Sequence, residues 1–223
     1  MNRAIDSRCL RSVGRNVQVP FRVKLGWKER NMELLCTRVV RVLPGKRLVC
    51  YGKWGDKEIV AKFFLDCRRA KKHTAREVRG IRALQEAGIT TPELLFEATL
   101  PPDRTPVLGF KRIVSSLNLA EIWDQAPDDD YRLRLLQRAV VVIAALHNAG
   151  LKQDDPHFKN LLVNGEKIYA IDGDLVDTRH KGRPLAWRKS LKNLAYFFAQ
   201  IPPLFEQLTA EAFKVYAAQR GWA

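Results

Sequence analysis

Three polar residues around one predicted β-hairpin have types and a spacing that suit phosphoryl transfer. Asp155 and Asn160 are five positions apart in the loop after a long apolar helix, and Asp172 follows the apolar run 167–171. Transfer of phosphate from a nucleotide needs a carboxylate beside the acceptor hydroxyl. It also needs an amide and a second carboxylate that hold Mg²⁺ against the phosphates. Loops on the two sides of a short hairpin can place these groups in one pocket. Taken alone, Asp155 and Asn160 could also be cap and turn residues.

A lysine and a glutamate further upstream extend this pattern. Lys62 interrupts the apolar run IVAKFF of a predicted strand, and an inward-pointing lysine is costly unless it is paired. Glu77 on the next predicted helix is a natural partner, and the lysine would then neutralise phosphate charge. The alternatives are a snorkelling edge-strand lysine and a capping-box glutamate that serves Thr74. The order Lys…Glu…Asp-x4-Asn…Asp is the layout of the protein-kinase-like fold.

The elements that must position these residues are strands early in the chain and helices later. Period-two and β-branched runs predict strands over 37–43, 47–51, 57–64, 94–98, 107–113, 161–164 and 167–172. Helical spacing predicts helices over 74–87, 119–125 and 129–149, and more helices in the last fifty residues. This order indicates an α+β chain with a small β-rich N-lobe and a mostly helical C-lobe. We expect a basic N-terminal extension (1–36), a nucleotide-binding N-lobe (37–113), and a C-lobe with the catalytic and metal site (114–223).

The chain is basic, and its charge is unevenly distributed. The 223 residues have a formal net charge of +15, and residues 1–72 contain 19 Lys and Arg against 6 Asp and Glu. This excess predicts an anionic partner, which could be nucleic acid, nucleotide phosphate or an anionic membrane surface. A content of 46% hydrophobic residues excludes wholesale disorder.

The ends of the chain and its cysteines narrow the class of protein. The N-terminus has no apolar run of the kind found in signal peptides, and the longest apolar run, 139–146, is far shorter than the roughly 20 residues that span a bilayer. We therefore expect a soluble cytoplasmic protein. The four cysteines (Cys9, Cys36, Cys50 and Cys67) have no zinc-site spacing, which predicts neither a metal framework nor disulfides.

Four stretches of the sequence resemble the lipopolysaccharide kinase (Kdo/WaaP) family. They are LHNAGLKQDDPHFKNLLV, IYAIDGD, REVRGIRALQEAGITTPELL and RKSLKNLAYFFAQI, and the resemblance extends over residues 37–200. Members of that family are kinase-fold enzymes that phosphorylate sugars of the lipopolysaccharide inner core. The resemblance implies ATP and Mg²⁺ as cofactors.

The resemblance also implies a role for individual residues. Asp155 would be the catalytic base, Lys62 would contact the nucleotide phosphates, and Glu77 would orient Lys62. Asn160 and Asp172 would bind Mg²⁺, and Asp174 matches the second acid of the Ile-Asp-x-Asp signature. Gly45 lies in the turn expected to cover the nucleotide. Two positions depart from the usual pattern: Gln153 stands where kinase-like loops have His, and Gly173 where the metal motif has Phe.

These features predict a kinase that phosphorylates a heptose or Kdo hydroxyl. We expect the protein to contact the anionic inner face of the inner membrane of a Gram-negative bacterium, and we expect no nucleic-acid partner. Two alternatives stay open. One is another small-molecule kinase or a RIO-like protein kinase, although an activation segment ending in Ala-Pro-Glu is missing. The other is a basic pseudokinase or nucleic-acid-binding module, although the usual RNA-binding aromatics are missing.

Overall fold

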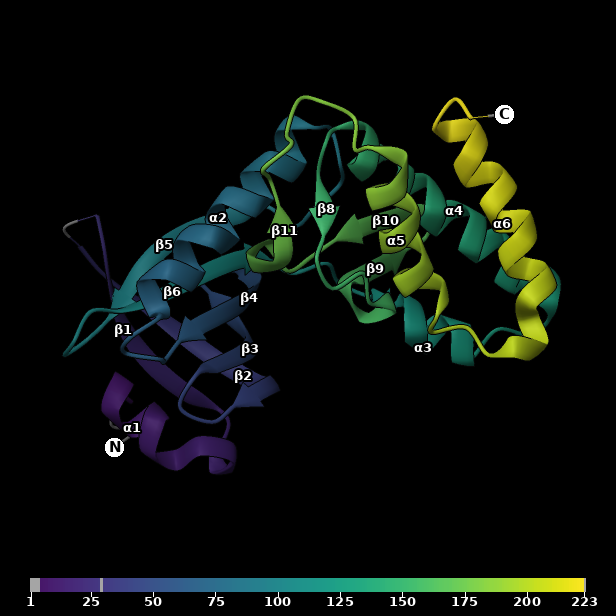
Figure 1. Ribbon diagram of the computed structural model, residues 1–223. Helices are drawn as coiled ribbons and strands as arrows, with labels where there is room; N and C mark the ends of the chain where they lie inside the picture. The colour runs from purple at the N-terminus through teal and green to yellow at the C-terminus, as the bar shows by residue number, and fades with distance from the viewer. Residues whose placement is uncertain (1–4, 29, 223) are drawn as a thin grey trace. The chain divides into compact units, whose positions relative to one another are not determined.

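The computed structural model describes residues 5–28 and 30–222. The chain divides into two compact units (Figure 1). Unit 1 comprises residues 1–76 and 92–112, and unit 2 comprises residues 77–91 and 113–223. Helix α2 (Ala70–Glu86) runs from unit 1 into unit 2. The chain is therefore α+β, as its sequence predicts.

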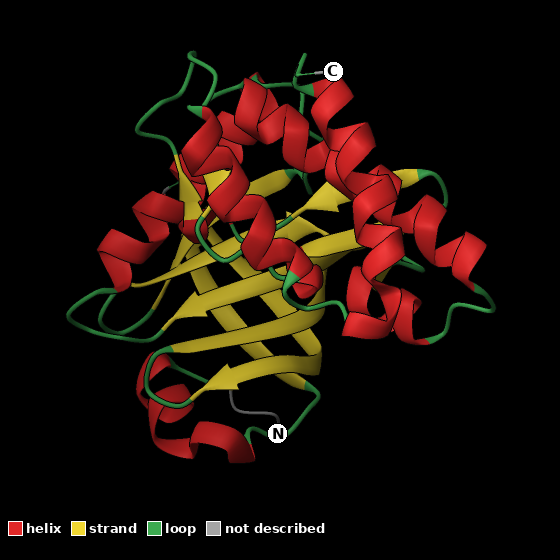
Figure 2. Ribbon diagram, turned by 45° about the vertical axis from the view of Figure 1, so that its right-hand side comes forward, coloured by secondary structure: helices red, strands yellow, loops and turns green. Residues whose placement is uncertain are grey.

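Unit 1 is built on a closed antiparallel barrel with the strand order β1-β2-β3-β4-β6-β5 (Figure 2). The strands are β1 (Phe21–Trp27), β2 (Arg30–Leu43), β3 (Arg47–Trp54), β4 (Lys57–Phe64), β5 (Leu94–Leu100) and β6 (Thr105–Lys111). The barrel closes where β1 meets β5, at Gly26 and Thr99. Inward-facing side chains such as Val23, Leu34 and Ala61 are completely buried. Because a closed barrel has no free strand edge, the barrel formed by the described residues of unit 1 presents no template for further strand pairing.

Residues 1–36, which we expected to form an extension, differ from that expectation in the structure. They supply helix α1 (Ser7–Val13), strand β1 and the first part of β2. In β1 buried and exposed residues alternate, and the charged Arg22 and Lys24 take the exposed positions. This alternation of apolar and charged residues is the pattern of a half-buried strand. Two of the basic residues that suggested an extension, Arg22 and Lys24, therefore lie on the outer face of a barrel strand.

Helix α2 begins earlier than its sequence suggests, at Ala70. Thr74 consequently lies inside the helix, where its hydroxyl donates to the carbonyl oxygen of Ala70 at 2.8 Å. The turn before the helix is held by Asp66, whose carboxylate accepts hydrogen bonds from the backbone amides of Arg68 and Arg69. The capping box of Thr74 with Glu77 is thus wrong, which frees Glu77 for another role.

Unit 2 is mostly helical. Its helices are α3 (Leu119–Asp124), α4 (Asp129–Asn148), α5 (Trp187–Phe198) and α6 (Glu206–Gln219), with short 3-10 turns at Phe158–Asn160, Gly173–Leu175 and Pro203–Phe205. Its strands are β7 (Leu117–Asn118), β8 (Lys152–Gln153), β9 (Leu161–Asn164), β10 (Lys167–Ala170) and β11 (Val176–Asp177). These strands form a sheet of order β10-β9-β7 and the pair β11-β8. The long helix α4 packs along α6 (Figure 1).

Among the described residues, no helix has the length and hydropathy needed to cross a bilayer. The four cysteines are free thiols in the structure, and two of them, Cys36 and Cys50, are buried in the barrel.

Candidate active site

The β9–β10 hairpin of unit 2 brings two of the predicted metal ligands together. Asn160 directly precedes β9, and Asp172 follows β10 by two residues. The strands pair up to Leu161 and Ala170, and the next amide, that of Ile171, donates to the carbonyl oxygen of Asn160 at 3.0 Å. The open end of the hairpin therefore brings the backbone segments that carry Asn160 and Asp172 close together. Their predicted role as metal ligands stays a prediction.

Asp172 has a backbone conformation that is rare for a residue with a side chain. Its φ of 67° and ψ of 64° place it in the left-handed region. The amide of Leu175 donates to the Asp172 carbonyl oxygen and begins a 3-10 turn that contains Asp174. Both carboxylates are largely buried, with exposed fractions of 9% and 4%. Such non-glycine positions persist only where surrounding contacts fix them, and they cluster at functional sites.

Glu77 supplies that fixation from helix α2. Its side chain is completely buried, one carboxylate oxygen accepts from the amide of Gly173 at 3.2 Å, and the other accepts from the amide of Asp174 at 3.1 Å. Hydrogen bonds to a charged acceptor contribute roughly 1.5–3 kcal/mol each. Glu77 therefore holds the segment Asp172–Asp174 in place. We call this segment the metal loop after its predicted role.

The glycine in the middle of the metal loop is explained by the close approach of helix α2. A Cβ atom on Gly173 would lie 2.4 Å from the carbonyl oxygen of Glu77, and one on Gly80 would lie 2.0 Å from the carbonyl oxygen of Gly173. Both distances are far below contact. A larger residue in the middle of the motif, such as the Phe usual in kinase-like proteins, has no room here.

We expect Gly173→Ala to lower the free energy of unfolding by about 3 kcal/mol, because the atom nearest to its methyl group, the carbonyl oxygen of Glu77, belongs to the helix backbone and cannot rotate away. Gly165→Ala is the matched control. It lies in the β9–β10 turn with open space around its Cβ and should cost only about 1 kcal/mol, for its left-handed backbone. Urea unfolding measures both values, and equal losses would contradict the close approach.

The loop that carries Asp155 is held by hydrogen bonds to its backbone, while the Asp155 carboxylate stays exposed to solvent. The carbonyl oxygen of Asp155 accepts from the amide of His157 at 2.7 Å and from the side-chain nitrogen of Asn160 at 2.9 Å. The side chain of Asp155 is exposed. This arrangement orients the side chain of Asn160, whose amide oxygen is left for another ligand, and it leaves the Asp155 carboxylate exposed.

Gln153 ties the Asp155 loop to the metal loop. Its side-chain nitrogen donates to the carbonyl oxygen of Ile171 at 3.0 Å, and its backbone pairs with Val176 in the β8–β11 ladder. A glutamine at this position thus supplies a donor to the residue just before Asp172. The departure from His leaves the connection between the two loops intact.

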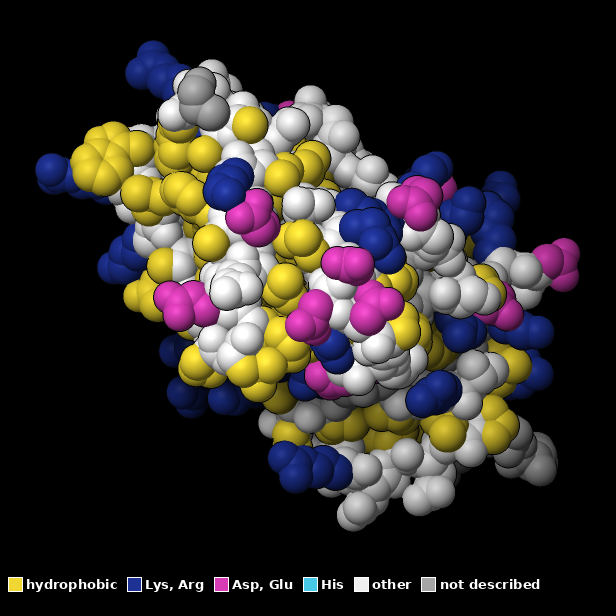
Figure 3. All heavy atoms as spheres, turned by 90° about the vertical axis from the view of Figure 1, so that its right-hand side faces the viewer, with side chains coloured by type: hydrophobic (Ala, Val, Ile, Leu, Met, Phe, Trp, Pro, Cys, Tyr) yellow, Lys and Arg dark blue, Asp and Glu magenta, His cyan; other side chains and the backbone are white. Residues whose placement is uncertain are grey.

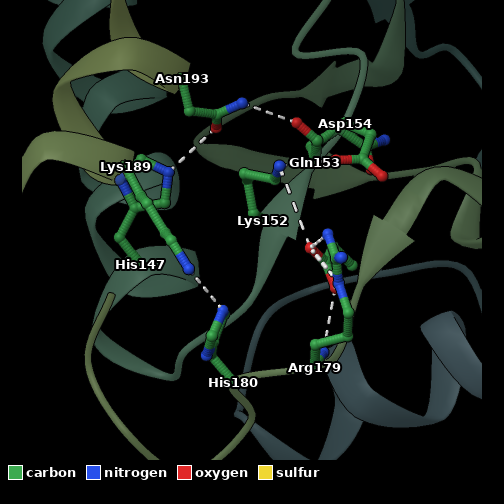
Figure 4. Close-up of polar contacts among 9 residues, drawn as sticks. His147, Lys152, Gln153, Asp154, Arg179, His180, Lys189 and Asn193 are labelled. Atoms are coloured by element: carbon green, nitrogen blue, oxygen red, sulfur yellow. Dashed lines mark hydrogen bonds and ion pairs between the residues drawn. The ribbon is translucent and has the colours of Figure 1, made fainter. Parts of the chain in front are cut away.

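A buried chain of hydrogen bonds reaches the same loop from the helices (Figure 4). Nδ1 of His147 bonds the Tyr216 hydroxyl at 2.7 Å, and its Nε2 bonds Oδ1 of Asn193 at 3.0 Å. The side-chain nitrogen of Asn193 donates to the carbonyl oxygen of Gln153 at 2.8 Å. With Asn193 oriented in this way, Nε2 of His147 carries the proton and Nδ1 accepts from Tyr216. Helices α4, α5 and α6 are therefore all connected to the strand that precedes Asp155.

The family of the protein follows from a comparison over most of the chain. The model of the lipopolysaccharide kinase (Kdo/WaaP) family matches residues 51–214. The chain belongs to this family. It is thus a member of a kinase family, as its sequence motifs suggest.

Two individual proteins are similar to this Kdo/WaaP family member. A solved structure titled "WaaP in complex with acyl carrier protein" matches with a TM-score of 0.59 and 20% identity, over 81% of this chain and 78% of the other. That likeness concerns the fold. The KEOPS complex subunit Bud32 of Pyrococcus abyssi (strain GE5 / Orsay) is 26% identical over 113 residues, 51% of this chain. The chain spans about half the length of this curated relative, 49%.

The oxygen atoms of the metal loop and of Asn160 have the chemistry that Mg²⁺ prefers. Mg²⁺ is usually held by one or two carboxylates together with substrate phosphates and water. Within residues 5–28 and 30–222, no group of three or more His, Cys, Asp or Glu forms a metal cluster. The candidate set of Asn160, Asp172 and Asp174 has two carboxylates and one amide, so it fits an ion that takes its remaining ligands from a nucleotide.

Lys62 and Gly45 lie in unit 1, and their predicted roles stay predictions. Lys62 is half-buried in β4 between Val49 and Leu108 of the neighbouring strands, with its ammonium 5.4 Å from the ring centre of Phe110. Gly45 has a φ of 66° in the turn between β2 and β3, where the Lys46 amide donates to the Leu43 carbonyl. Glu77 belongs to unit 2, and its predicted pairing with Lys62 stays a prediction as well.

Sequence reasoning missed three residues that hold the site: Gly80, Asn193 and Tyr216. Two of them left a signal. Asn193 is a polar residue on the apolar face that Leu194 and Phe197 give to α5, and Gly80 interrupts a helical pattern. Tyr216 left none, because an aromatic residue at helical spacing is usually part of the core.

The buried His147 makes the stability of the fold depend on pH. Burial lowers the pKa of His147 from 6.5 to about 4, aided by the charges of Arg220 and Lys152 and opposed by the hydrogen bond to Asn193. As the pH falls below 6.5, the unfolded chain takes up the proton first. Stability is therefore full above pH 6.5 and falls by about 3 kcal/mol as the pH approaches 4. In urea unfolding between pH 7 and 4.5, His147→Gln should show a shallower loss, and an unchanged slope would contradict this assignment.

Proposed function

We propose that the protein transfers the γ-phosphate of ATP to a hydroxyl of heptose or Kdo in the lipopolysaccharide inner core, with Mg²⁺ as cofactor. One observation carries the proposal: the Asp155 loop and the metal loop are joined at one end of the β9–β10 hairpin, by bonds from Ile171 to Asn160 and from Gln153 to Ile171. Membership of a lipopolysaccharide kinase family supports this substrate class.

Each residue has a defined task in this mechanism. The exposed carboxylate of Asp155 would accept the proton of the sugar hydroxyl as that oxygen attacks the γ-phosphorus of ATP, while the bond from that phosphorus to the β,γ-bridging oxygen breaks and ADP leaves. Asp172, Asp174 and the amide oxygen of Asn160 would hold Mg²⁺, and Lys62 would contact the nucleotide phosphates. Bound ATP and Mg²⁺ supply the phosphoryl group and neutralise its charge. Glu77 keeps the metal loop in shape through its two backbone bonds.

A substrate comparison tests the acceptor. Purified protein is incubated with radiolabelled ATP and Mg²⁺ together with delipidated lipopolysaccharide, an aminoglycoside, choline or a generic protein. We expect label on the lipopolysaccharide alone. Label only on a small molecule or only on protein would overturn the sugar assignment and leave the kinase assignment standing.

A RIO-like protein kinase is the second candidate, favoured by the similarity to Bud32 over half of the chain. Phosphorylation of the generic protein would support it. A pseudokinase and a nucleic-acid-binding module would both transfer no phosphate. ATP with Mg²⁺ should raise the thermal unfolding temperature of a nucleotide-binding protein but not that of a nucleic-acid-binding module, which would instead be retained on DNA in a salt-dependent way.

We also propose that the protein acts on the inner face of the inner membrane of a Gram-negative bacterium, where an anionic surface would be its second partner. The net charge of +15 supports such a partner. No nucleic-acid partner is part of the proposal, so retention on DNA at physiological salt would count against it.

A further inference from the structure

Besides the basic residues 1–72, a second basic region lies in unit 2. The residues after 72 are close to neutral as a whole, so their total charge does not reveal this region. Residues 178–205 contain six Lys or Arg and no Asp or Glu. They begin after β11, three residues beyond the metal loop, form the connection from β11 to α5, continue through α5 and end before α6. Elsewhere in unit 2 charges of both signs are mixed, as the face formed by α4 and α6 shows, where acidic and basic side chains are neighbours (Figure 3).

Two of the six charges are neutralised by partners. Arg179 forms an ion pair with Asp177 at 2.6 Å, and Lys181 forms one with Glu86. Both pairs anchor the segment to the rest of unit 2.

The other four basic residues carry uncompensated charge. Within the part of the chain that the structure describes, no acidic side chain pairs with Arg183, Arg188, Lys189 or Lys192. The Lys189 ammonium donates to Nε2 of His180 at 2.9 Å, a contact that Figure 4 shows. All four side chains are exposed. Four neighbouring cations without counter-charges produce a positive surface that attracts anions.

The backbone that carries these charges is firmly held. The amides of Gly182 and Leu185 donate to the carbonyl oxygens of Ala149 and His147 at the end of α4, at 3.0 and 2.8 Å. Gly150 lets the segment lie directly on this helix end, because a Cβ there would be 2.0 Å from the carbonyl oxygen of His180. The surface is therefore preformed and would lose little entropy on binding.

Aromatic residues are placed beside the charges on α5. The inward face of the helix, which includes Asn193 and Phe197, is buried. Arg188, Lys192 and Tyr196 follow one another at intervals of four and form a stripe on the outward face. Trp187 begins the helix, with the Arg188 guanidinium 5.1 Å from its ring centre.

Three large apolar side chains along this region are open to solvent. The exposed fractions are 57% for Trp187, 58% for Tyr196 and, beyond the end of α5, 77% for Leu204. Trp and Tyr are enriched at the interface between lipid and water, where Lys and Arg bind anionic headgroups. A stripe on the outer face of a helix is convex, whereas sites for small molecules are concave.

We propose that the four basic residues together with Trp187, Tyr196 and Leu204, the α5 surface, dock the protein onto an anionic lipid membrane. This inference deepens the proposed function, on which it rests for the lipid-anchored substrate. It places the membrane contact on unit 2, the unit of Asp155 and Asp172, rather than on the more basic residues 1–72. The exposed aliphatic Leu204 favours a lipid surface over nucleic acid, because an aliphatic side chain gains nothing beside a phosphate backbone.

Vesicle sedimentation without nucleotide tests the docking surface. The full-length protein is mixed with vesicles of phosphatidylcholine containing 30% phosphatidylglycerol, or of phosphatidylcholine alone. We expect binding to the anionic vesicles that weakens as salt is added. Each charge removed should lower the partition coefficient about fivefold, so Arg188→Gln with Lys192→Gln should lower it about 25-fold. Trp187→Ala should lower it too.

The matched control removes the same charge from unit 1. Arg38 and Arg41 are exposed on β2, and Arg38→Gln with Arg41→Gln should change binding less than threefold. An equal loss in both double variants, or no binding by the parent protein, would overturn the docking surface. So would retention on DNA that Arg188→Gln with Lys192→Gln abolishes.

Phosphate transfer to the delipidated acceptor separates this inference from the proposed function. The Arg188→Gln, Lys192→Gln protein should keep the parent rate on that soluble substrate, because neither side chain belongs to the proposed catalytic set. A failure of transfer in the parent protein would refute the proposed function. Loss of vesicle binding by the α5 variants would still support the docking surface in that case, because vesicle binding is measured without phosphate transfer.

Discussion

Replacement of Asp172 by Asn is expected to reduce phosphate transfer by about three orders of magnitude. A metal ion contributes several kcal/mol to stabilising the charge of the transferring group, and about 4 kcal/mol corresponds to a factor of roughly 10³. Asn is the informative replacement because Asp172 has a φ of 67°, which Asn tolerates better than Ala does. Asp172→Asn therefore removes the charge and keeps the backbone of the metal loop.

The measurement is the transfer rate as Mg²⁺ is increased. The Asp172→Asn protein should need much more Mg²⁺, while its thermal unfolding temperature stays within a few degrees of the parent's. Asp124→Asn, an exposed position at the end of α3, is the matched control and should behave as the parent does. A parent-like rate for Asp172→Asn would show that Asp172 does not bind the metal.

The elements that carry the site could be predicted because each has a strong local signal. The long helix ends in a glycine, the hairpin turns at Asn164-Gly165, and β4 is an apolar run, so their ranges agree with the structure to within a residue or two. The start of α2 was missed by four residues because the cap comes from Asp66, which precedes a basic run rather than an apolar one. The basic residues that follow Asp66 do not show the apolar spacing by which the start of a helix is usually recognised.

The barrel of unit 1 was harder to foresee. Its first strand carries Arg22 and Lys24, and its closure depends on the pairing of β1 with β5, which lies about seventy residues further along the chain. A contact between distant segments leaves no periodic trace in either of them. The sequence therefore indicates the strands better than the way in which they are joined.

The same limit applies to the site. Asn160 and Asp172 flank one hairpin and Asp155 lies in the loop just before it, so their spacing along the chain is enough to predict that they belong to one site. The two bonds from Glu77 to the metal loop join residues 96 and 97 positions apart. Their existence depends on Gly80 and Gly173, which let the helix and the loop touch. The departure at Gly173 is the sequence signal of this packing, and its meaning became clear only in three dimensions.

Replacement of Asp155 by Asn should produce the other large effect, and a different one. A positioned general base contributes a factor of about 10² to 10⁴, so kcat should fall by this amount. Nucleotide binding should be unchanged, because the contacts that shape the loop use the backbone carbonyl of Asp155 and not its carboxylate. Asp155→Asn keeps that carbonyl and the size of the side chain.

The adjacent Asp154 is a demanding control. It is also exposed, and its carboxylate pairs with Lys152 at 2.8 Å, a surface contact worth at most about 1 kcal/mol. Asp154→Asn should thus change kcat less than fivefold. Single-turnover transfer with saturating ATP and acceptor separates the two neighbours, since chemistry is then measured without binding. If Asp154→Asn proved the more damaging change, the register of the loop would have to shift by one residue. The match to the Asp-x4-Asn motif would then be wrong, and with it the assignment of Asp155 as base and Asn160 as metal ligand.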